Sequence, residues 1–150
     1  MTLADLLQNR VLLVALSAWL AAQALKPPLD YLSSRKWKWT LLLDAGGMPS
    51  SHSALIVGAT LAVGLFHGFD NPLFGLAVAL TMIVTYDAAG VRRQAGIQAE
   101  RINVLVEELL HGKMWDQEEL REVIGHTPLE VLGGVTLGIV VAVAARLLVG

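Results

Sequence analysis

Residues 46–53, with the sequence GGMPSSHS, combine groups that can bind phosphate with a side chain that can transfer a proton. Gly47 permits a close backbone approach, and Ser50 and Ser51 are favoured at helix N-termini, where backbone N–H groups attract anions. His52 can donate or accept a proton near neutral pH. A capped helix beside an incidental histidine is the alternative reading. The combination of two glycines, three serines and a histidine in one segment favours a phosphate site.

A second histidine, His126, stands in the sequence GHTPLE at residues 125–130. Thr127 and Glu130, with a proline between them, have the spacing of a capping box, and that reading explains those residues by itself. It does not account for His126. Glu130 follows His126 by one helical turn, so its carboxylate can accept from one ring nitrogen and leave the other nitrogen nucleophilic. We therefore predict His126 as a nucleophile oriented by Glu130, with Thr127 in support.

Positive charges that could hold a phosphate occur at the ends of two apolar runs. Arg92 and Arg93 stand in the sequence DAAGVRRQAG at residues 87–96, and Lys26 closes the first apolar run. Arginine can bind phosphate oxygens through forked hydrogen bonds, but it can equally anchor a helix in the headgroup layer. Asp87 can pair with one of these cations. We predict Lys26, Arg92 and Arg93 as substrate-binding residues and Asp87 as a supporting residue.

The composition indicates a membrane protein. Of the 150 residues, 55% are hydrophobic and 16% are charged, whereas about a quarter are charged in soluble domains. The net charge of −2 creates no field that would attract a nucleic acid. The chain has no cysteine, which excludes disulfides, thiolate nucleophiles and cysteine-bound metals. The length predicts a single membrane-embedded domain, residues 1–150.

Four apolar runs predict an all-α bundle of about four transmembrane helices. A hydrocarbon core needs about 20 helical residues to cross, and backbone groups in lipid must be bonded within the helix. The fourth run meets that length, whereas the first three are shorter and would need tilt or a locally thin bilayer. The runs are residues 11–25, 51–66, 72–86 and 129–149.

The connection between the third and fourth runs, residues 90–125, is polar. Apolar residues recur at helical spacing among charged ones over residues 97–110, which predicts an amphipathic cytoplasmic helix. Residues 116–124 are charged and predict a second short helix. We expect both helices to cover the end of the bundle.

The distribution of positive charges predicts the orientation of the bundle. Four spans place the first–second and third–fourth connections on one side of the membrane, together with all the predicted site residues. Nine of the eleven Lys and Arg residues fall on that side, and such an excess is typical of the cytoplasmic side. The nine are Lys26, Arg35, Lys36, Lys38, Arg92, Arg93, Arg101, Lys113 and Arg121, and the two others are Arg10 and Arg146.

In these segments the chain resembles a known family of phosphatases. The residues PSSH at 49–52 resemble the Pro-Ser-Gly-His signature of the type-2 phosphatidic acid phosphatases, and His126 with Glu130 resembles their His-x-x-x-Asp. The strings GGMPSSHSA, DAAGVRRQAG and GHTPLEV are similar to the divergent branch of that superfamily, also described as acid phosphatase/vanadium-dependent haloperoxidase-related. The resemblance extends from about residue 23 to residue 138.

The resemblance implies a membrane enzyme that hydrolyses a lipid phosphate, either a phosphomonoester or a diphosphate, through a phosphohistidine. His126 would be the nucleophile, Glu130 would take the role of the orienting acid, and His52 would protonate the leaving group. Ser50 and Ser51 would line the phosphate pocket. The implied partners are the lipid phosphate and membrane lipids, and no nucleic acid. The resemblance implies no metal and no other cofactor, and it implies that vanadate mimics the transition state.

The chain departs from the superfamily pattern at the positions of the phosphate-binding cations. The third motif has Ser-Arg ahead of its histidine, but Leu120 stands six residues before His126, and Arg121 is one position away. The first motif has Arg-Pro seven residues after its lysine, but Ser33 stands seven residues after Lys26. The chain is also shorter than the usual six-span members.

Two other functions remain open. A non-catalytic lipid-phosphate-binding or scaffolding bundle would keep the phosphate pocket. A metal-dependent CDP-alcohol phosphotransferase would need clustered aspartates, and the next aspartate after Asp87 is Asp116. Gly-x-x-x-Gly patterns at residues 64–68 and 134–138 allow close helix packing within one chain or between two, so a homodimer is a further prediction.

Overall fold

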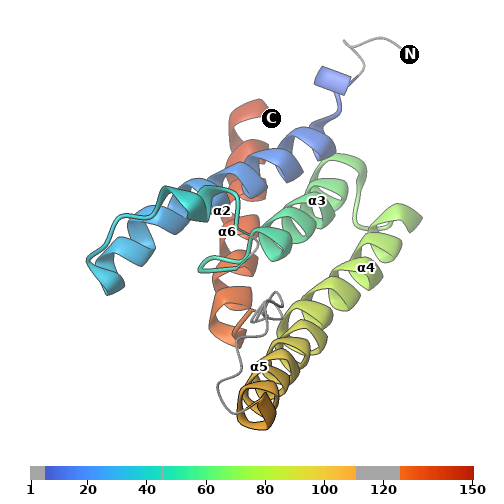
Figure 1. Cartoon of the computed structure of the whole chain (residues 1–150). Helices are drawn as coiled ribbons and strands as arrows, with labels where there is room; N and C mark the ends of the chain where they lie inside the picture. Colours follow the sequence, from blue (N-terminus) through green and yellow to red (C-terminus); the bar gives the residue numbers. More distant parts are fainter. Residues whose placement is uncertain (1–5, 45, 111–125) are drawn as a thin grey trace.

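A computed structural model of the chain is an all-α bundle (Figure 1). It describes residues 6–44, 46–110 and 126–150, without the side chains of residues 91–93, 95 and 106–110. Within these residues there are five α-helices, and a short 3-10 helix, η1, connects the first two of them. The helices are α2 (Arg10–Ser34), η1 (Trp39–Leu42), α3 (Ser51–His67), α4 (Pro72–Ala89), α5 (Val91–Leu110) and α6 (Pro128–Val149).

Three helices, α2, α4 and α6, are long and apolar enough to cross a membrane. The predicted second span is α3, which is apolar but has 17 residues. At 1.5 Å per residue such a helix is about 26 Å long, less than the ~30 Å hydrocarbon core. It is also enclosed, because eight of its 17 residues are buried and it contacts α2, α4 and α6. The short helix is therefore the centre of the bundle.

The first span ends later than the sequence predicts. The apolar run predicts an end near Leu25 with Lys26 closing the span, but α2 continues through Pro27 and Pro28 to Ser34. Proline lacks a backbone donor and usually bends or ends a helix. Here Lys26 and Pro27 are buried, and α2 contacts η1, so tertiary packing offsets the lost hydrogen bonds. We call residues 29–44, which extend beyond the bundle in Figure 1, the α2–η1 lobe.

Helices α3 and α6 pack closely because glycines of α6 face the backbone of α3. A Cβ at Gly134 would overlap the carbonyl oxygen of Ser50, and a Cβ at Gly138 would lie 2.7 Å from the carbonyl oxygen of Ala54. At Gly64 an added Cβ would meet the ring of Phe69. The glycines of both patterns therefore make contacts within the chain. The homodimer stays a prediction, and its interface would have to be another surface.

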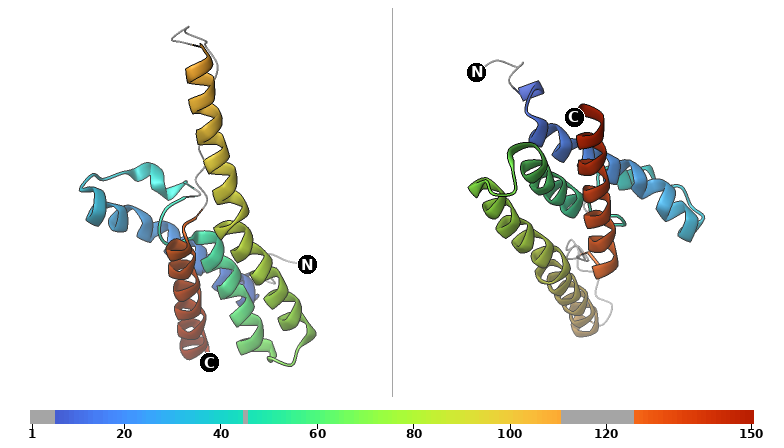
Figure 2. Two further views of the ribbon diagram at one scale, coloured as in Figure 1. Left: turned by 90° about the horizontal axis from the view of Figure 1, so that it is seen from below. Right: turned by 180° about the vertical axis from the view of Figure 1, so that it is seen from behind.

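Helices α4 and α5 form the exposed side of the bundle. A single residue of α4, Ala88, is buried. Helix α5 follows α4 at Gly90 and extends away from the other helices (Figure 2). The amphipathic helix predicted over residues 97–110 is confirmed, but among the described residues α5 contacts α4 and no other helix, so it does not cover the bundle. The helix predicted at residues 116–124 lies outside the described residues.

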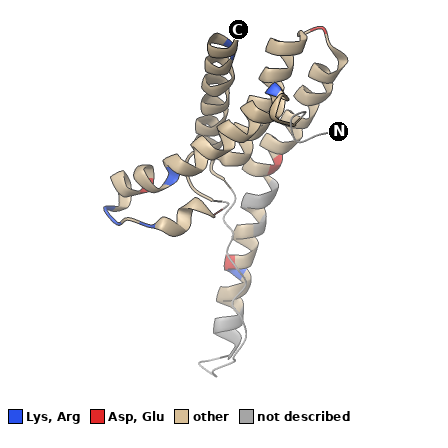
Figure 3. Ribbon diagram, turned by 90° about the horizontal axis from the view of Figure 1, so that it is seen from above, with Lys and Arg blue, Asp and Glu red and all other residues tan. Residues whose placement is uncertain are grey.

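The helix ends and the segments that connect the helices lie at two opposite ends of the bundle. The end of α6 and the α3–α4 connection lie at one end, whereas α5 and the start of α6 lie at the other (Figures 1 and 2). Charged residues gather on the α2–η1 lobe, on α5 and near helix ends, and the middle parts of α3, α4 and α6 carry none (Figure 3). This pattern is that of a membrane protein, whose apolar middle is in contact with lipid.

Candidate functional site

His52 and His126 stand at the starts of α3 and α6, and side-chain caps define both starts. At α3, Ser50 Oγ accepts hydrogen bonds from the backbone N–H and the hydroxyl of Ser53, at 3.3 and 3.0 Å. At α6, Thr127 Oγ1 accepts from the N–H of Glu130, and Glu130 Oε2 accepts from the N–H of Thr127. The predicted capping box is confirmed. Both helices thus begin at positions set by the local sequence.

A backbone hydrogen bond joins the two helix starts. The N–H of Ser50 donates to the carbonyl oxygen of Glu130 at 2.9 Å, beside the point where Gly134 lies against Ser50. As a result the rings of His52 and His126 are neighbours, with 6.2 Å between their centres and 57° between their planes. His126 is 4% exposed, whereas His52 is exposed. One histidine is therefore held inside the protein and the other faces outward beside it.

Glu130 is positioned to orient the ring of His126. Glu130 Oε2 lies 3.3 Å from His126 Nδ1, and the same oxygen accepts from the N–H of Thr127 at 2.9 Å. A neutral imidazole that donates through Nδ1 carries its lone pair on Nε2. The capping and orienting interpretations of Glu130 therefore hold together, because one carboxylate oxygen makes both contacts.

The predicted phosphate loop lies beside these groups. Ser50 and Ser51 are buried, with at most 1% of each exposed, and Ser53 joins them in a cluster of hydroxyls at the start of α3. The backbone reaches this cluster through Gly47, at φ 87°, and a cis peptide bond between Met48 and Pro49. Positive φ is the region that favours glycine, so a side chain at position 47 would strain the loop. The sequence-based set of site residues omitted Ser53, whose place one turn after Ser50 was the available signal.

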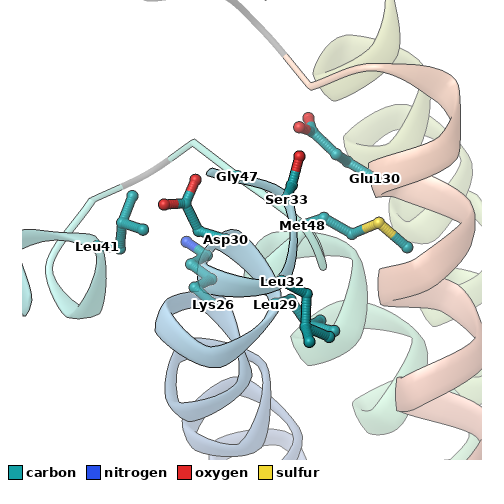
Figure 4. Close-up of a pocket in the computed structure, with 9 residues that line it drawn as sticks. All are labelled: Lys26, Leu29, Asp30, Leu32, Ser33, Leu41, Gly47, Met48 and Glu130. Atoms are coloured by element: carbon teal, nitrogen blue, oxygen red, sulfur yellow. The ribbon is translucent and has the colours of Figure 1, made fainter. Parts of the chain in front are cut away.

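Lys26 has a contact that the sequence did not predict. Its side chain is 1% exposed, and Nζ donates to the carbonyl oxygen of Asp44 at 2.6 Å. A buried ammonium group is costly unless it is hydrogen-bonded, so this bond ties α2 to the loop that leads to Gly47. Lys26 and Glu130 line the same groove, drawn in Figure 4. The observed role of Lys26 is thus to anchor the loop, and its contact with a phosphate stays a prediction.

The other predicted residues lie on α4 and α5. Asp87 is half-buried near the end of α4, and Arg92 and Arg93 belong to the first turn of α5, where the side chains are not described. The predicted arginine clamp therefore stays a prediction. Among the described residues, no three His, Asp or Glu side chains are grouped so that they could hold a metal ion. The described part of the chain thus contains no group of metal ligands of the kind that a CDP-alcohol phosphotransferase would need.

Sequence reasoning overlooked Gln23. This residue is 8% exposed on α2, one turn before Lys26, and its Oε1 has no hydrogen-bond partner among the described residues. A polar side chain inside a membrane helix is costly and is usually retained for function. The available signal was the presence of Gln23 and Lys26 three residues apart at the end of an apolar run.

Comparison with known proteins shows the family to which the chain belongs. The sequence pattern of the Divergent PAP2 family matches residues 7–141. The chain belongs to the Divergent PAP2 family. This family member is 40% identical over 146 residues to the uncharacterized membrane protein YuiD of Bacillus subtilis (strain 168), a match that covers 90% of this chain and 92% of that protein. No solved structure matches the chain. The family match includes every predicted site residue and confirms the resemblance found in the sequence.

Proposed function

We propose that this membrane protein is a metal-independent phosphatase that hydrolyses a lipid phosphomonoester or diphosphate through a phosphohistidine. The observation that carries the proposal is the pair His52 and His126, with ring centres 6.2 Å apart and Glu130 at Nδ1 of His126. The nucleophilic nitrogen has to lie about 3 Å from phosphorus, and the general acid has to lie within hydrogen-bond distance of the leaving oxygen. The spacing of the rings suits one phosphorus-centred group between them.

The proposed reaction has two steps. In the first, His126 Nε2 attacks phosphorus and forms a P–N bond, the P–O bond to the lipid breaks, and protonated His52 gives its proton to the leaving oxygen. In the second, water attacks the phosphohistidine, His52 takes the proton of the water, and the P–N bond breaks to release inorganic phosphate. Glu130 stabilises the positive charge that the His126 ring carries while phosphorus is attached.

The surroundings of the pair support an anion at this point. The start of α3 carries the positive end of a helix dipole, which favours an anion nearby. In the proposal, the loop before α3 binds the phosphate through Gly47, Ser50 and Ser51. Positive charge for the phosphate comes from Lys26, Arg92 and Arg93. Thr127 supports Glu130 through the capping box, and Asp87 supports the arginines. The positive-inside distribution of Lys and Arg supports a site that faces the cytoplasm.

The test is phosphate release from a panel of lipid phosphates that contains phosphatidic acid, phosphatidylglycerophosphate, an isoprenyl phosphate and an isoprenyl diphosphate. We expect release that resists EDTA and is inhibited by vanadate. His126→Ala should abolish release, His52→Ala should lower it about 100-fold or more, and Glu130→Gln should slow it without unfolding the protein. His67→Ala, an exposed histidine at the far end of α3, is the matched control and should leave release unchanged.

Two outcomes would contradict the proposal. Release that persists in His126→Ala would remove the proposed nucleophile. If the folded protein binds vanadate but releases phosphate from no lipid, the non-catalytic lipid-phosphate-binding function is correct instead. A vesicle arm, with the protein in a known orientation and substrate added to one leaflet, tests the cytoplasmic site, since release should follow substrate in the cytoplasmic leaflet alone.

A further inference from the structure

A groove of about 550 Å3 lies between the α2–η1 lobe and the start of α6. That volume is within the range of pockets that bind small molecules. Three charged side chains, Lys26, Asp30 and Glu130, belong to its lining, and Asp30 is paired with Lys38, whose Nζ lies 3.5 Å from Asp30 Oδ2. The apolar part of the lining includes Leu29, Leu32, Leu41 and Met48. A mainly apolar wall, with one cation and two carboxylates among its lining residues, fits an amphiphilic ligand.

The groove shares Glu130 with the candidate site. Glu130 is part of the groove lining, and its carboxylate also contacts His126 Nδ1 at 3.3 Å. Figure 4 shows Glu130 and Leu41 on opposite sides of the groove, with Lys26 and Leu29 of α2 between them. Met48 extends toward α6, where its Cε would lie 3.4 Å from a Cβ at Gly133. The groove thus combines the residue that orients His126 with four apolar side chains.

The α2–η1 lobe carries the residues of a membrane interface. Tyr31, Trp37 and Trp39 are exposed and in contact, with ring centres 5.7 Å apart for the first two and 5.3 Å for the last two. The exposed cations Arg35, Lys36 and Lys38 lie in the same lobe. Exposed aromatic rings beside lysine and arginine are typical of the layer where headgroups meet hydrocarbon. The groove therefore opens where the chain of a bilayer lipid can enter it.

We propose that this groove binds a hydrocarbon chain of the lipid whose phosphate lies between His52 and His126. The proposal rests on the proposed function for the position of the phosphate. Burial of methylene groups against Leu29, Leu32, Leu41 and Met48 stabilises a long chain and contributes nothing for a substrate without one. The preferred substrates are therefore phosphate esters of long-chain alcohols, and short water-soluble phosphomonoesters lack the part that the groove recognises.

The first test compares substrates that share a headgroup and differ in chain length, in mixed micelles. Leu41→Trp narrows the groove, and Leu32→Trp does so at a side chain that is 68% exposed, where the fold tolerates a larger residue. We expect KM for the long-chain substrate to rise about tenfold in both variants, the ratio expected for roughly two methylene groups lost from the site. The kcat/KM for the short soluble ester should stay within about twofold. Met82→Trp, at an exposed position on α4, is the matched control and should change neither value.

The second test does not need catalysis. His126→Ala protein is irradiated with a long-chain lipid phosphate that carries a photoreactive group in its chain, and the labelled peptides are identified. We expect label on peptides that contain Leu29, Leu32, Leu41 or Met48, and competition by unlabelled long-chain phosphate but not by the short ester.

The outcomes separate this proposal from the proposed function. Label confined to α4, or equal losses on long and short substrates in the tryptophan variants, would overturn the groove as a chain site while phosphate release stands. If the label in the groove depends on chain length and the unsubstituted protein releases no phosphate, the groove proposal is supported and the phosphatase proposal is contradicted.

Discussion

The two sides of α3 are built in different ways. Toward α6 the helices meet backbone to backbone, and Gly134 lies so close to the carbonyl of Ser50 that a Cβ there would overlap it. Toward α4 the contact includes a hydrogen bond of 2.7 Å between the hydroxyls of Thr60 and Thr81. On α4, a Cβ at Gly75 would have no described atom within 4 Å. The first contact is backbone against backbone, whereas the second includes hydrogen bonds from the Thr60 side chain to Ala77 and Thr81.

The difference coincides with the position of the candidate site. His52, His126 and Glu130 all belong to the start of the α3–α6 contact, and none of them belongs to α4. In a bilayer, apolar side chains gain little by leaving lipid for each other, so close backbone packing and hydrogen bonds determine how helices pair. We therefore expect changes at the α3–α6 contact to alter both stability and the site. Changes at the α3–α4 contact should alter stability slightly and leave the site intact.

The largest effect is expected for Gly134→Ala, compared with Gly75→Ala. At position 134 the new Cβ would overlap the Ser50 carbonyl and lie 2.9 Å from the Cβ of Ser53, so we expect a loss of about 1–3 kcal/mol in the free energy of unfolding. Phosphate release should fall as well, since the two helix starts separate. Gly75→Ala should not lower stability, because alanine is the better helix former and the position is open. The free energy of unfolding of both variants can be measured in detergent. An equal loss of stability in the two variants would mean that the α3–α6 contact is not close.

An intermediate effect is expected for Thr127→Ala. The change removes one side of the capping box, which costs about 1 kcal/mol. Glu130 can still accept from the backbone N–H at position 127, so phosphate release should fall less than in Glu130→Gln. Thr127→Ser should restore the stability. A loss of release in Thr127→Ala as large as in Glu130→Gln would show that the cap, and not the carboxylate, positions His126.

The smallest effect is expected at the contact of α3 with α4. A double-mutant cycle of Thr60→Val and Thr81→Val should give a coupling free energy of about 0.6 kcal/mol, the average for hydrogen bonds between membrane helices. Valine keeps the shape of threonine and removes the hydroxyl. Phosphate release by the double variant should equal that of the parent protein. A loss of release would contradict the separation of the two sides of α3.

Local patterns in the sequence predicted most of the helices and their starts. The caps at Ser50 and Thr127 were predictable because each joins groups three residues apart. The end of α2 was not, because burial of Lys26 and Pro27 overrides the tendency of proline to stop a helix. The position of α5 was missed for a related reason, since an amphipathic pattern predicts a helix but not the surface that its apolar side contacts.

The sequence by itself determined the membrane class, the family and the pair formed by His126 and Glu130, because His126 directly precedes the capping box that fixes the Glu130 carboxylate at the start of α6. Only the tertiary structure decided that His52 lies beside that pair, that Lys26 bonds to the carbonyl of Asp44, and that Glu130 lines a groove. Each of these depends on the approach of segments that are distant in the chain. That approach is made by the glycines of α6 and the hydrogen bond from Ser50 to Glu130, and helical spacing contains no information about such contacts.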